Sequence, residues 1–329
     1  MAYDAEVVRR ARHRLESAKA DKESENRQKL QMIYEKLPRV RQIDMELRKS
    51  MVMATQAVFA GGDGAQAAME KVKEANLALQ AERKGLIDAA FGKDFLDESP
   101  ICTHCGGLGY VGTQMCSCLQ ELCRQEQKKE LTLLSCGEHD FSDFRLEYYP
   151  DRAISGGKVT LRAIMQKTYQ DCRTYAQNFN TNSPSLLFSG DTGLGKTFLS
   201  ACIARAVADK GYSVVYESAV HLFEKMEKAK FSGDEAAAKE TEKYTACDLL
   251  IVDDLGTEMG GQFVTTALYT LINDRILSGK PTIISTNLTK EDMDKRYSSQ
   301  ILSRLRGNYK RVPFVGDDIR ILKNRGAVL

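Results

Sequence analysis

A glycine-rich run that ends in lysine and threonine is the strongest chemical signal in the chain. It reads Gly190, Asp191, Thr192, Gly193, Leu194, Gly195, Lys196 and Thr197, which fits the pattern G-x-x-x-x-G-K-T. Glycines let several backbone N–H groups converge on one phosphate, and a helix beginning near Lys196 directs its positive end at the same anion. Lys196 is expected to reach the β- and γ-phosphates, and the Thr197 hydroxyl to bind Mg²⁺. The run therefore predicts a site for ATP.

A pair of aspartates follows the apolar stretch Leu249–Val252 further along the chain. Ligands of open parallel sheets bind where the carboxyl ends of the strands emerge. We therefore expect Asp253 to hold Mg²⁺ and Asp254 to orient or deprotonate the attacking water. An aspartate at a strand end can instead cap the next turn, but the phosphate-binding loop upstream favours the metal.

Three further polar residues can complete such a site. Asn287 follows a third apolar strand and is predicted to reach the γ-phosphate or the attacking water; alternatively, it opens the loop before the capping box Thr289–Asp292. Arg304 and Arg320 can stabilise charge that develops on the γ-phosphate. Alternatively, both arginines belong to a solvated basic tail, since residues 290–329 hold ten Lys and Arg against five Asp and Glu.

The elements that must position these side chains alternate between short strands and longer amphipathic helices. The predicted strands are rich in leucine or β-branched residues: Ser185–Ser189, Ser213–Tyr216, Leu249–Val252 and Thr282–Ser285. This alternation predicts an α/β fold in which a parallel sheet lies between two layers of helices.

The first hundred residues differ in kind because they consist mostly of good helix formers. Apolar residues recur at helical spacing on both sides of Pro38, and Gly61–Gly64 breaks the pattern before a helix from Ala65 to about Ala90. We predict a helical hairpin or small bundle. It either binds a partner or serves as a coiled-coil spacer.

Two close cysteine pairs separate these regions: Cys102 with Cys105, and Cys116 with Cys118. Joined by a glycine-rich turn, they can supply four thiolates to one tetrahedral Zn²⁺, and so short a segment has too few apolar residues for its own core. His104 and Cys123 are alternative ligands. Free thiols or a redox pair are the alternatives to structural zinc. The remaining cysteines are expected to be small buried hydrophobes: Cys136, Cys172, Cys202 and Cys247.

Charge and hydropathy exclude several classes of protein. The 47 Lys and Arg nearly balance the 45 Asp and Glu, so nucleic-acid binding requires a local basic patch. No apolar run approaches the roughly 18 residues that span a bilayer, and the N-terminus is too polar for a secretory signal. We expect a cytoplasmic protein without membrane contact.

From about Cys136 onward, the order of motifs resembles the AAA+ ATPase core of bacterial replicative helicase loaders, the DnaC/DnaI family, which is close to the IstB-like transposition helpers. The matching stretches are FSDF (141–144), GDTGLGKT (190–197), LLIVDDLG (249–256), STN (285–287), SRL (303–305) and GDDIR (316–320). The resemblance implies that Asn287 is sensor 1, Arg320 the sensor 2 arginine, and Arg304 an arginine finger for a neighbouring subunit's nucleotide. It therefore implies a ring or spiral oligomer. Asp254 departs from the broader AAA+ pattern, in which Glu is usual.

The resemblance extends loosely to the cysteines, since DnaI-type loaders carry a zinc-binding N-terminal region. It leads to three predicted domains: a helical partner-binding region (1–99), a zinc module (100–135) and an AAA+ ATPase domain with a short lid (136–329). In loader-type proteins the region of Val220–Phe231 lies near the pore, where Lys228, Lys230 and Phe231 would grip single-stranded DNA by charge and stacking. Alternatively, that stretch is an amphipathic surface helix.

Three functions compete. The first is an ATP-dependent loader that holds the replicative DNA helicase and places it on single-stranded DNA, and the long helical region with its cysteine module favours it. The second is an IstB-like ATPase that oligomerises on DNA to assist a transposase. The third, a metabolic P-loop kinase, leaves Asn287, Arg304 and Arg320 unexplained.

Overall fold

The computed structural model describes residues 3–60, 65–133, 140–153 and 159–324. The predicted break at Gly61–Gly64, the predicted boundary between 135 and 136, and Cys136 lie outside these residues. The chain divides into two compact units, His13–Cys116 and the combination of Met1–Arg12 with Ser117–Leu329. The functional division into 1–99, 100–135 and 136–329 stays a prediction.

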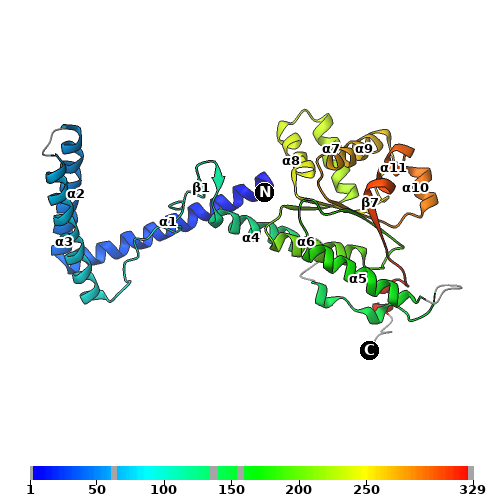
Figure 1. Ribbon diagram of the computed structural model, residues 1–329, viewed down its shortest axis with the longest axis horizontal. Helices are drawn as coiled ribbons and strands as arrows, with labels where there is room; N and C mark the ends of the chain where they lie inside the picture. The colour runs from blue at the N-terminus through cyan, green and yellow to red at the C-terminus, as the bar shows by residue number, and fades with distance from the viewer. Residues whose placement is uncertain (1–2, 61–64, 134–139, 154–158, 325–329) are drawn as a thin grey trace. The chain divides into compact units, whose positions relative to one another are not determined.

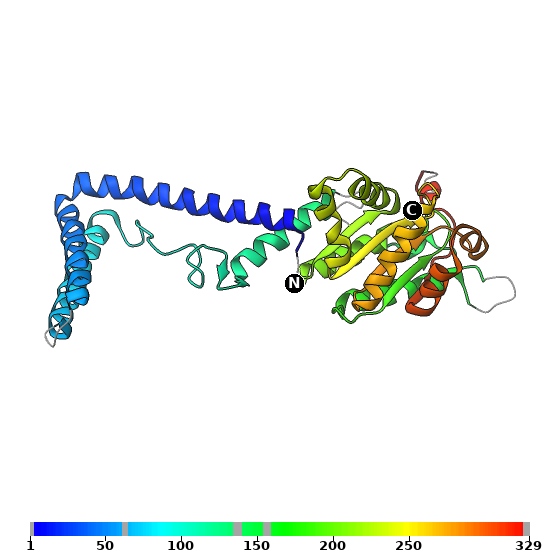
Figure 2. The ribbon, with the colours of Figure 1, turned by 90° about the horizontal axis from the view of Figure 1, so that it is seen from above.

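The larger unit is built on a five-stranded parallel sheet with the order β4-β5-β6-β3-β7. Figure 2 shows this unit from above. The strands are β3 (Ser185–Ser189), β4 (Val214–Ser218), β5 (Leu249–Leu255), β6 (Thr282–Thr286) and β7 (Tyr309–Pro313). The first four confirm the predicted strands. The fifth, β7, was missed because the exposed Lys310 and Arg311 interrupt its apolar pattern.

Helices cover both faces of the sheet, as Figure 1 shows for this unit. One layer holds α4 (Ser117–Leu133), α5 (Leu161–Gln177) and α6 (Lys196–Asp209); the other holds α7 (Ala219–Phe231), α8 (Glu235–Ala246), α9 (Gln262–Leu277) and α11 (Ser299–Asn308). Each face carries its own apolar core: Leu199 and Ile203 pack with Phe188 on one, and Leu222 and Leu268 pack with Leu250 on the other. The predicted α/β fold, in which a parallel sheet lies between two layers of helices, is thereby confirmed. The predicted burial of Cys172, Cys202 and Cys247 is also confirmed, at 1–2% exposure.

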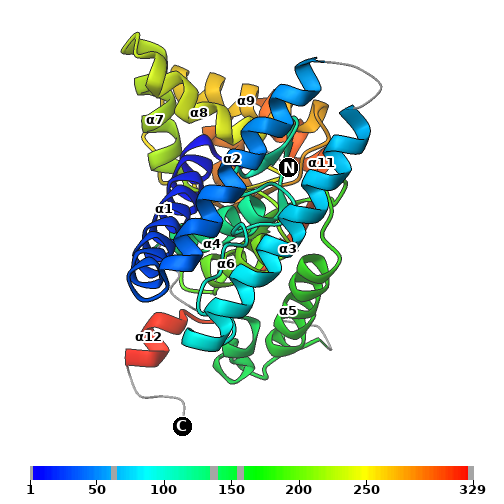
Figure 3. The same cartoon turned by 90° about the vertical axis from the view of Figure 1, so that its left-hand side faces the viewer.

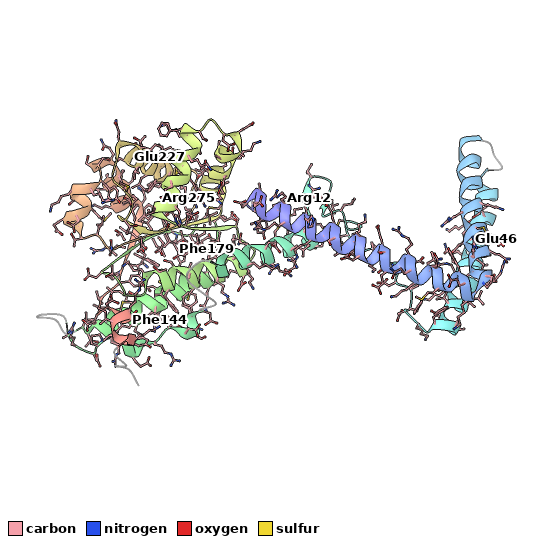
Figure 4. All side chains as sticks on the ribbon, turned by 180° about the vertical axis from the view of Figure 1, so that it is seen from behind. Arg12, Glu46, Phe144, Phe179, Glu227 and Arg275 are labelled. Carbon is pink, nitrogen blue, oxygen red and sulfur yellow. The ribbon has the colours of Figure 1, made fainter. Side chains whose placement is uncertain are left out.

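One fully buried cation links α9 to the segments that lead into β5 and β6. Arg275 of α9, labelled in Figure 4, is 1% exposed. Its guanidinium donates to Thr282 Oγ1 at 2.7 Å, to Pro281 O at 2.6 Å and to Tyr244 O at 2.9 Å. These oxygens compensate the cost of removing the charge from water.

A side chain of helix α4 forms hydrogen bonds with the backbone at the start of the edge strand β4. The Gln127 side chain donates from Nε2 to Tyr212 O at 2.9 Å and accepts from Val214 N–H at 3.2 Å. Its neighbour Glu126 is 6% exposed and pairs with Arg10 at 3.5 Å. Side chains of α4 therefore satisfy backbone groups that no neighbouring strand reaches.

The smaller unit consists mainly of helices. It holds most of α1 (Ala5–Lys36), together with α2 (Pro38–Ala60) and α3 (Ala65–Phe91). Helices α2 and α3 lie side by side, as Figure 3 shows, which confirms the predicted hairpin. Its core includes Ile33, Val40 and Ile87, each at most 5% exposed. Within the described ranges, no helix is both long and apolar enough to cross a membrane.

Candidate nucleotide-binding site

The glycine-rich run forms a loop between β3 and α6. Gly190, Gly193 and Gly195 have φ angles of 155°, 74° and 87°, which L side chains rarely adopt, and Gly195 caps the start of α6. The buried Lys196 ammonium donates to the carbonyl oxygens of Gly190 and Asp191, both at 2.7 Å. Burial lowers the pKa of Lys196, and the charge of Asp254 opposes that shift. This geometry fits a phosphate-binding loop.

The same loop is packed tightly against the segment that follows β7. A Cβ on Gly190 would lie 2.2 Å from Phe314 O, and one on Gly193 would lie 1.9 Å from Asp318 Oδ1. The N–H of Ile319 donates to Gly193 O at 3.0 Å. Glycine is required here for close approach as well as for backbone conformation.

The aspartate pair lies at the carboxyl end of β5, where the pairing with β6 shifts register between Val252 and Leu255. Asp253 is 6% exposed; Tyr216 Oη donates to its Oδ2 at 2.8 Å, and Ser285 Oγ donates to its Oδ1. Ser285 Oγ also accepts from Asp254 N–H at 2.8 Å. Burial, followed by the charge of Asp253, raises the pKa of Asp254. The raised pKa makes Asp254 a better proton acceptor than an ordinary aspartate.

A cavity of about 370 Å³ opens above the loop. Its lining brings together the predicted residues Thr192, Gly193, Leu194, Gly195, Lys196, Thr197, Asp254, Asn287 and Arg320. Asp253 is not part of the lining; it is the residue before Asp254 and is held by β4 and β6. Anionic phosphates would meet Lys196 and Arg320 here, which matches the predicted chemistry.

Arg304 does not line this cavity, and neither do the predicted residues Gly190, Asp191 and Asp253. Arg304 lies on α11, where its guanidinium sits 4.3 Å from the ring centroid of Tyr269 and donates to that hydroxyl at 2.6 Å. Nη2 and Nε also donate to Asn273 Oδ1 at 2.9 and 3.1 Å. Its role as a finger for a neighbouring subunit stays a prediction.

One side of the cavity is formed by a group of largely aromatic residues, the aromatic wall, which was not predicted from the sequence. It comes from the short helices η1 (Phe141–Asp143) and η2 (Leu146–Tyr148) and their flanks, and its lining residues are Asp143, Phe144, Arg145, Tyr148 and Tyr149. Phe144, labelled in Figure 4, stacks on Tyr169 with ring centroids 4.8 Å apart, and Tyr149 Oη donates to Leu194 O at 3.0 Å. The half-buried rings of Phe144 and Tyr148 give this side of the cavity apolar surface, which suits a nucleotide base. The FSDF motif was the one sequence signal near it.

The four predicted cysteines form a separate cluster. The Sγ atoms of Cys102, Cys105, Cys116 and Cys118 all lie within 4.8 Å of one another. Cys102 and Cys116 are 3.7 Å apart, close to the about 3.8 Å that two sulfurs keep on a tetrahedral zinc with 2.3 Å bonds. Among the described residues this group includes neither His104 nor Cys123. The donor set therefore fits Zn²⁺.

A tight hairpin builds the cysteine cluster. Strands β1 (Tyr110–Val111) and β2 (Gln114–Met115) pair antiparallel between the two cysteine pairs. Gly109 N–H donates to Cys105 Sγ at 3.2 Å, and the Gly109 carbonyl accepts from Cys116 N–H at 2.8 Å. N–H donation to sulfur stabilises a thiolate, which a metal ligand requires.

Comparisons with known proteins support a nucleotide-binding site in the larger unit of the chain. The IstB-like ATP binding protein family matches residues 161–327. The replicative helicase loader DnaC of Escherichia coli (strain K12) is 27% identical over 149 residues, which cover 45% of this chain and 61% of the loader. The chain thus spans about three fifths of the length of this curated relative.

Two solved structures are similar to the chain. The crystal structure of the DnaC helicase loader covers 53% of this chain and 98% of its own, with a TM-score of 0.44 and 20% identity. That of DnaI covers 57% of this chain and 94% of its own, with a TM-score of 0.45 and 17% identity.

Proposed function

Because the chain belongs to the family of IstB-like ATP binding proteins, we propose that it is a Mg²⁺-dependent ATPase that holds the replicative DNA helicase and places it on single-stranded DNA. The observation that carries the ATPase part is the convergence of Lys196, Asp254, Asn287 and Arg320 on one cavity. The helicase part rests on the similarity to a replicative helicase loader named DnaC. The single-stranded DNA part rests on the exposed Phe231 and its neighbour Lys230 at the end of α7.

Six of the predicted residues have a part in the proposed hydrolysis. Thr197 and Asp253 would hold Mg²⁺, which neutralises charge on the β- and γ-phosphates when bound. Lys196 neutralises the same oxygens, and Asn287 orients the attacking water. Asp254 accepts the water proton as the bond to the leaving ADP breaks, and its raised pKa suits that task. Arg320 stabilises the charge that develops on the γ-phosphate.

The proposed oligomer can be tested by mixing subunits. Lys196→Ala removes the nucleotide site of one subunit, and Arg304→Ala removes the finger offered to the next. Each variant alone is expected to lack turnover, whereas a 1:1 mixture recovers up to about a quarter of wild-type activity if interfaces form at random. Arg306→Ala is the matched control, because Arg306 lies on the same helix and pairs with Asp294 at the surface. A mixture without recovered turnover would contradict a finger acting between subunits.

The loader part predicts a helicase contact on the smaller unit. Its exposed apolar residues include Met32, Met45 and Leu77, at 48%, 48% and 56% exposure. Capture of the host's replicative helicase by the full chain should fall when Met45 and Leu77 are changed to Asp. Leu277→Asp is the control, since Leu277 is 78% exposed on α9 of the larger unit. No capture by the wild type with or without ATP would contradict the loader.

The proposed contact with single-stranded DNA is supported at the end of α7. Phe231 is 67% exposed, and Lys230 Nζ lies 5.7 Å from its ring centroid and 5.5 Å from that of Phe263. Leu222 and Phe223 of the same helix are buried in the core, as an amphipathic helix requires. Replacing Lys228, Lys230 and Phe231 together should weaken binding of single-stranded DNA, and unchanged affinity would contradict this contact.

The second candidate is an IstB-like ATPase that oligomerises on DNA to assist a transposase, and the family match favours it. Tighter binding to duplex than to single-stranded DNA, together with no helicase capture, would select this candidate.

A further inference from the structure

A buried carboxylate lies just beyond the aspartate pair and was not singled out by its sequence context. The Glu258 side chain is 2% exposed. Its Oε2 accepts from Gly256 N–H at 2.6 Å, while its Oε1 accepts from Tyr297 Oη at 2.6 Å and pairs with Arg296 Nε at 3.2 Å. A buried carboxylate is costly unless it is fully paired, so these bonds hold Glu258 in one position.

On one side, Glu258 closes the turn that presents two cavity residues. Asp254 has a φ of 56°, a conformation that non-glycine residues seldom adopt. Thr257 donates to Asp254 O from its N–H at 3.2 Å and from its hydroxyl at 2.8 Å. Both Asp254 and Thr257 line the nucleotide cavity. The bond from Gly256 to Glu258 therefore fixes the loop on which Asp254 depends for its direction.

On the other side, Glu258 holds the connection between two helices. Arg296 is the last residue of α10 (Lys290–Arg296), and Tyr297 precedes α11. Tyr297 is 5% exposed and belongs to the same apolar core as Ile301 and Leu305 of α11. The helix held in this way is the one that carries Arg304. One carboxylate thus bonds both the Asp254 loop and the base of α11.

We propose that Glu258 is a positioning residue for ATP hydrolysis. Through its bonds to Tyr297 and Arg296, Glu258 couples the direction of the Asp254 side chain to the position of α11. This inference rests on the proposed function. A change in the α11 position is transmitted to Asp254 because both ends of the link are short hydrogen bonds to the same buried group. A purely structural role would instead affect folding stability and leave turnover per folded site unchanged.

Glu258→Gln tests the proposal with little change in shape. The amide nitrogen that replaces one oxygen cannot accept from Gly256 N–H or Tyr297 Oη, so one side of the link is lost. With MgATP as substrate, we expect the turnover number to fall about tenfold or more while KM stays within about threefold. Tyr297→Phe removes one bond and keeps the ring, so a smaller loss of about threefold is expected. Asp294→Asn is the matched control, because it removes the surface pair with Arg306 on the same helices.

Hydrogen exchange gives a second readout that does not need turnover. In Glu258→Gln the peptides covering residues 254–258 and 296–305 should both exchange faster than in the wild type, whereas Asp294→Asn should leave 254–258 unchanged. Faster exchange in residues 254–258 alone would overturn the coupling, and so would wild-type turnover in a folded Glu258→Gln. If the wild type itself hydrolyses no ATP, the proposed ATPase function fails, and the exchange pattern still decides whether the link exists.

Discussion

Replacing Gly193 by alanine should damage the phosphate-binding loop in two ways that can be measured separately. The φ of 74° at Gly193 imposes about 1–2 kcal/mol of backbone strain on an L residue. The new Cβ would also lie 1.9 Å from Asp318 Oδ1 and 2.2 Å from its Cγ, so the Asp318 side chain must move. That side chain accepts from Arg320 N–H at 2.8 Å, and losing this bond costs about 1 kcal/mol. The total of about 2–3 kcal/mol corresponds to a melting temperature lower by roughly 4–12 °C.

A double-mutant cycle separates the two costs. In the wild-type background Asp318→Ala should cost about 1 kcal/mol, because only the bond to Arg320 is lost. In the Gly193→Ala background it should cost almost nothing, since the carboxylate has already been displaced. Gly279→Ala is the control for strain alone, because Gly279 has a φ of 64° with no atom within 4 Å of its added Cβ. Denaturant unfolding gives all four free energies, and strictly additive costs would refute this account of the contact.

Three further predictions concern charge, metal and core. Asp254→Asn should abolish turnover and should raise the melting temperature more at pH 8 than at pH 4. Because the pKa of Asp254 is raised in the folded protein, its ionised form destabilises the fold. This destabilisation is absent below the ordinary pKa of 3.8 and is complete only above the pKa in the folded protein. Equal effects at both pH values would contradict this. Cys116→Ser should lower the zinc content from one ion per chain, measured by atomic absorption, while Cys123→Ser should not. Arg275→Met should cost about 3–4 kcal/mol in urea unfolding because buried carbonyl oxygens lose their donor, and an unchanged midpoint would contradict that role.

The elements that sequence reasoning located best are those whose signals are local. The phosphate-binding loop joins a buried strand, three conformationally free glycines and a helix start, and all of these are written in consecutive residues. The four cysteines are also close together in the sequence, and a short hairpin brings their side chains together. Strand β7 shows the limit of this reasoning, because its apolar residues Tyr309 and Val312 are separated by two charged ones.

What the sequence did not reveal depends on contacts between distant segments. The aromatic wall around Phe144 lies on two three-residue helices and beside them, and such helices are too short to show a periodicity. Glu258 reads as an ordinary loop acid until α10 and Tyr297 are packed beside it. The position of Arg304 outside its own cavity follows from the packing of α11 on α9, and the spacing of residues carries no record of that contact.

The two edges of the sheet carry features that disfavour pairing with further strands. An open edge offers free N–H and C=O groups and invites aggregation. At β4, the Gln127 amide occupies backbone groups of Tyr212 and Val214. At β7, exposed Lys310 and Arg311 are followed by Pro313, which has no N–H to donate. These features oppose edge-to-edge pairing between copies of this chain, so we expect an ordered assembly to form through helices and loops.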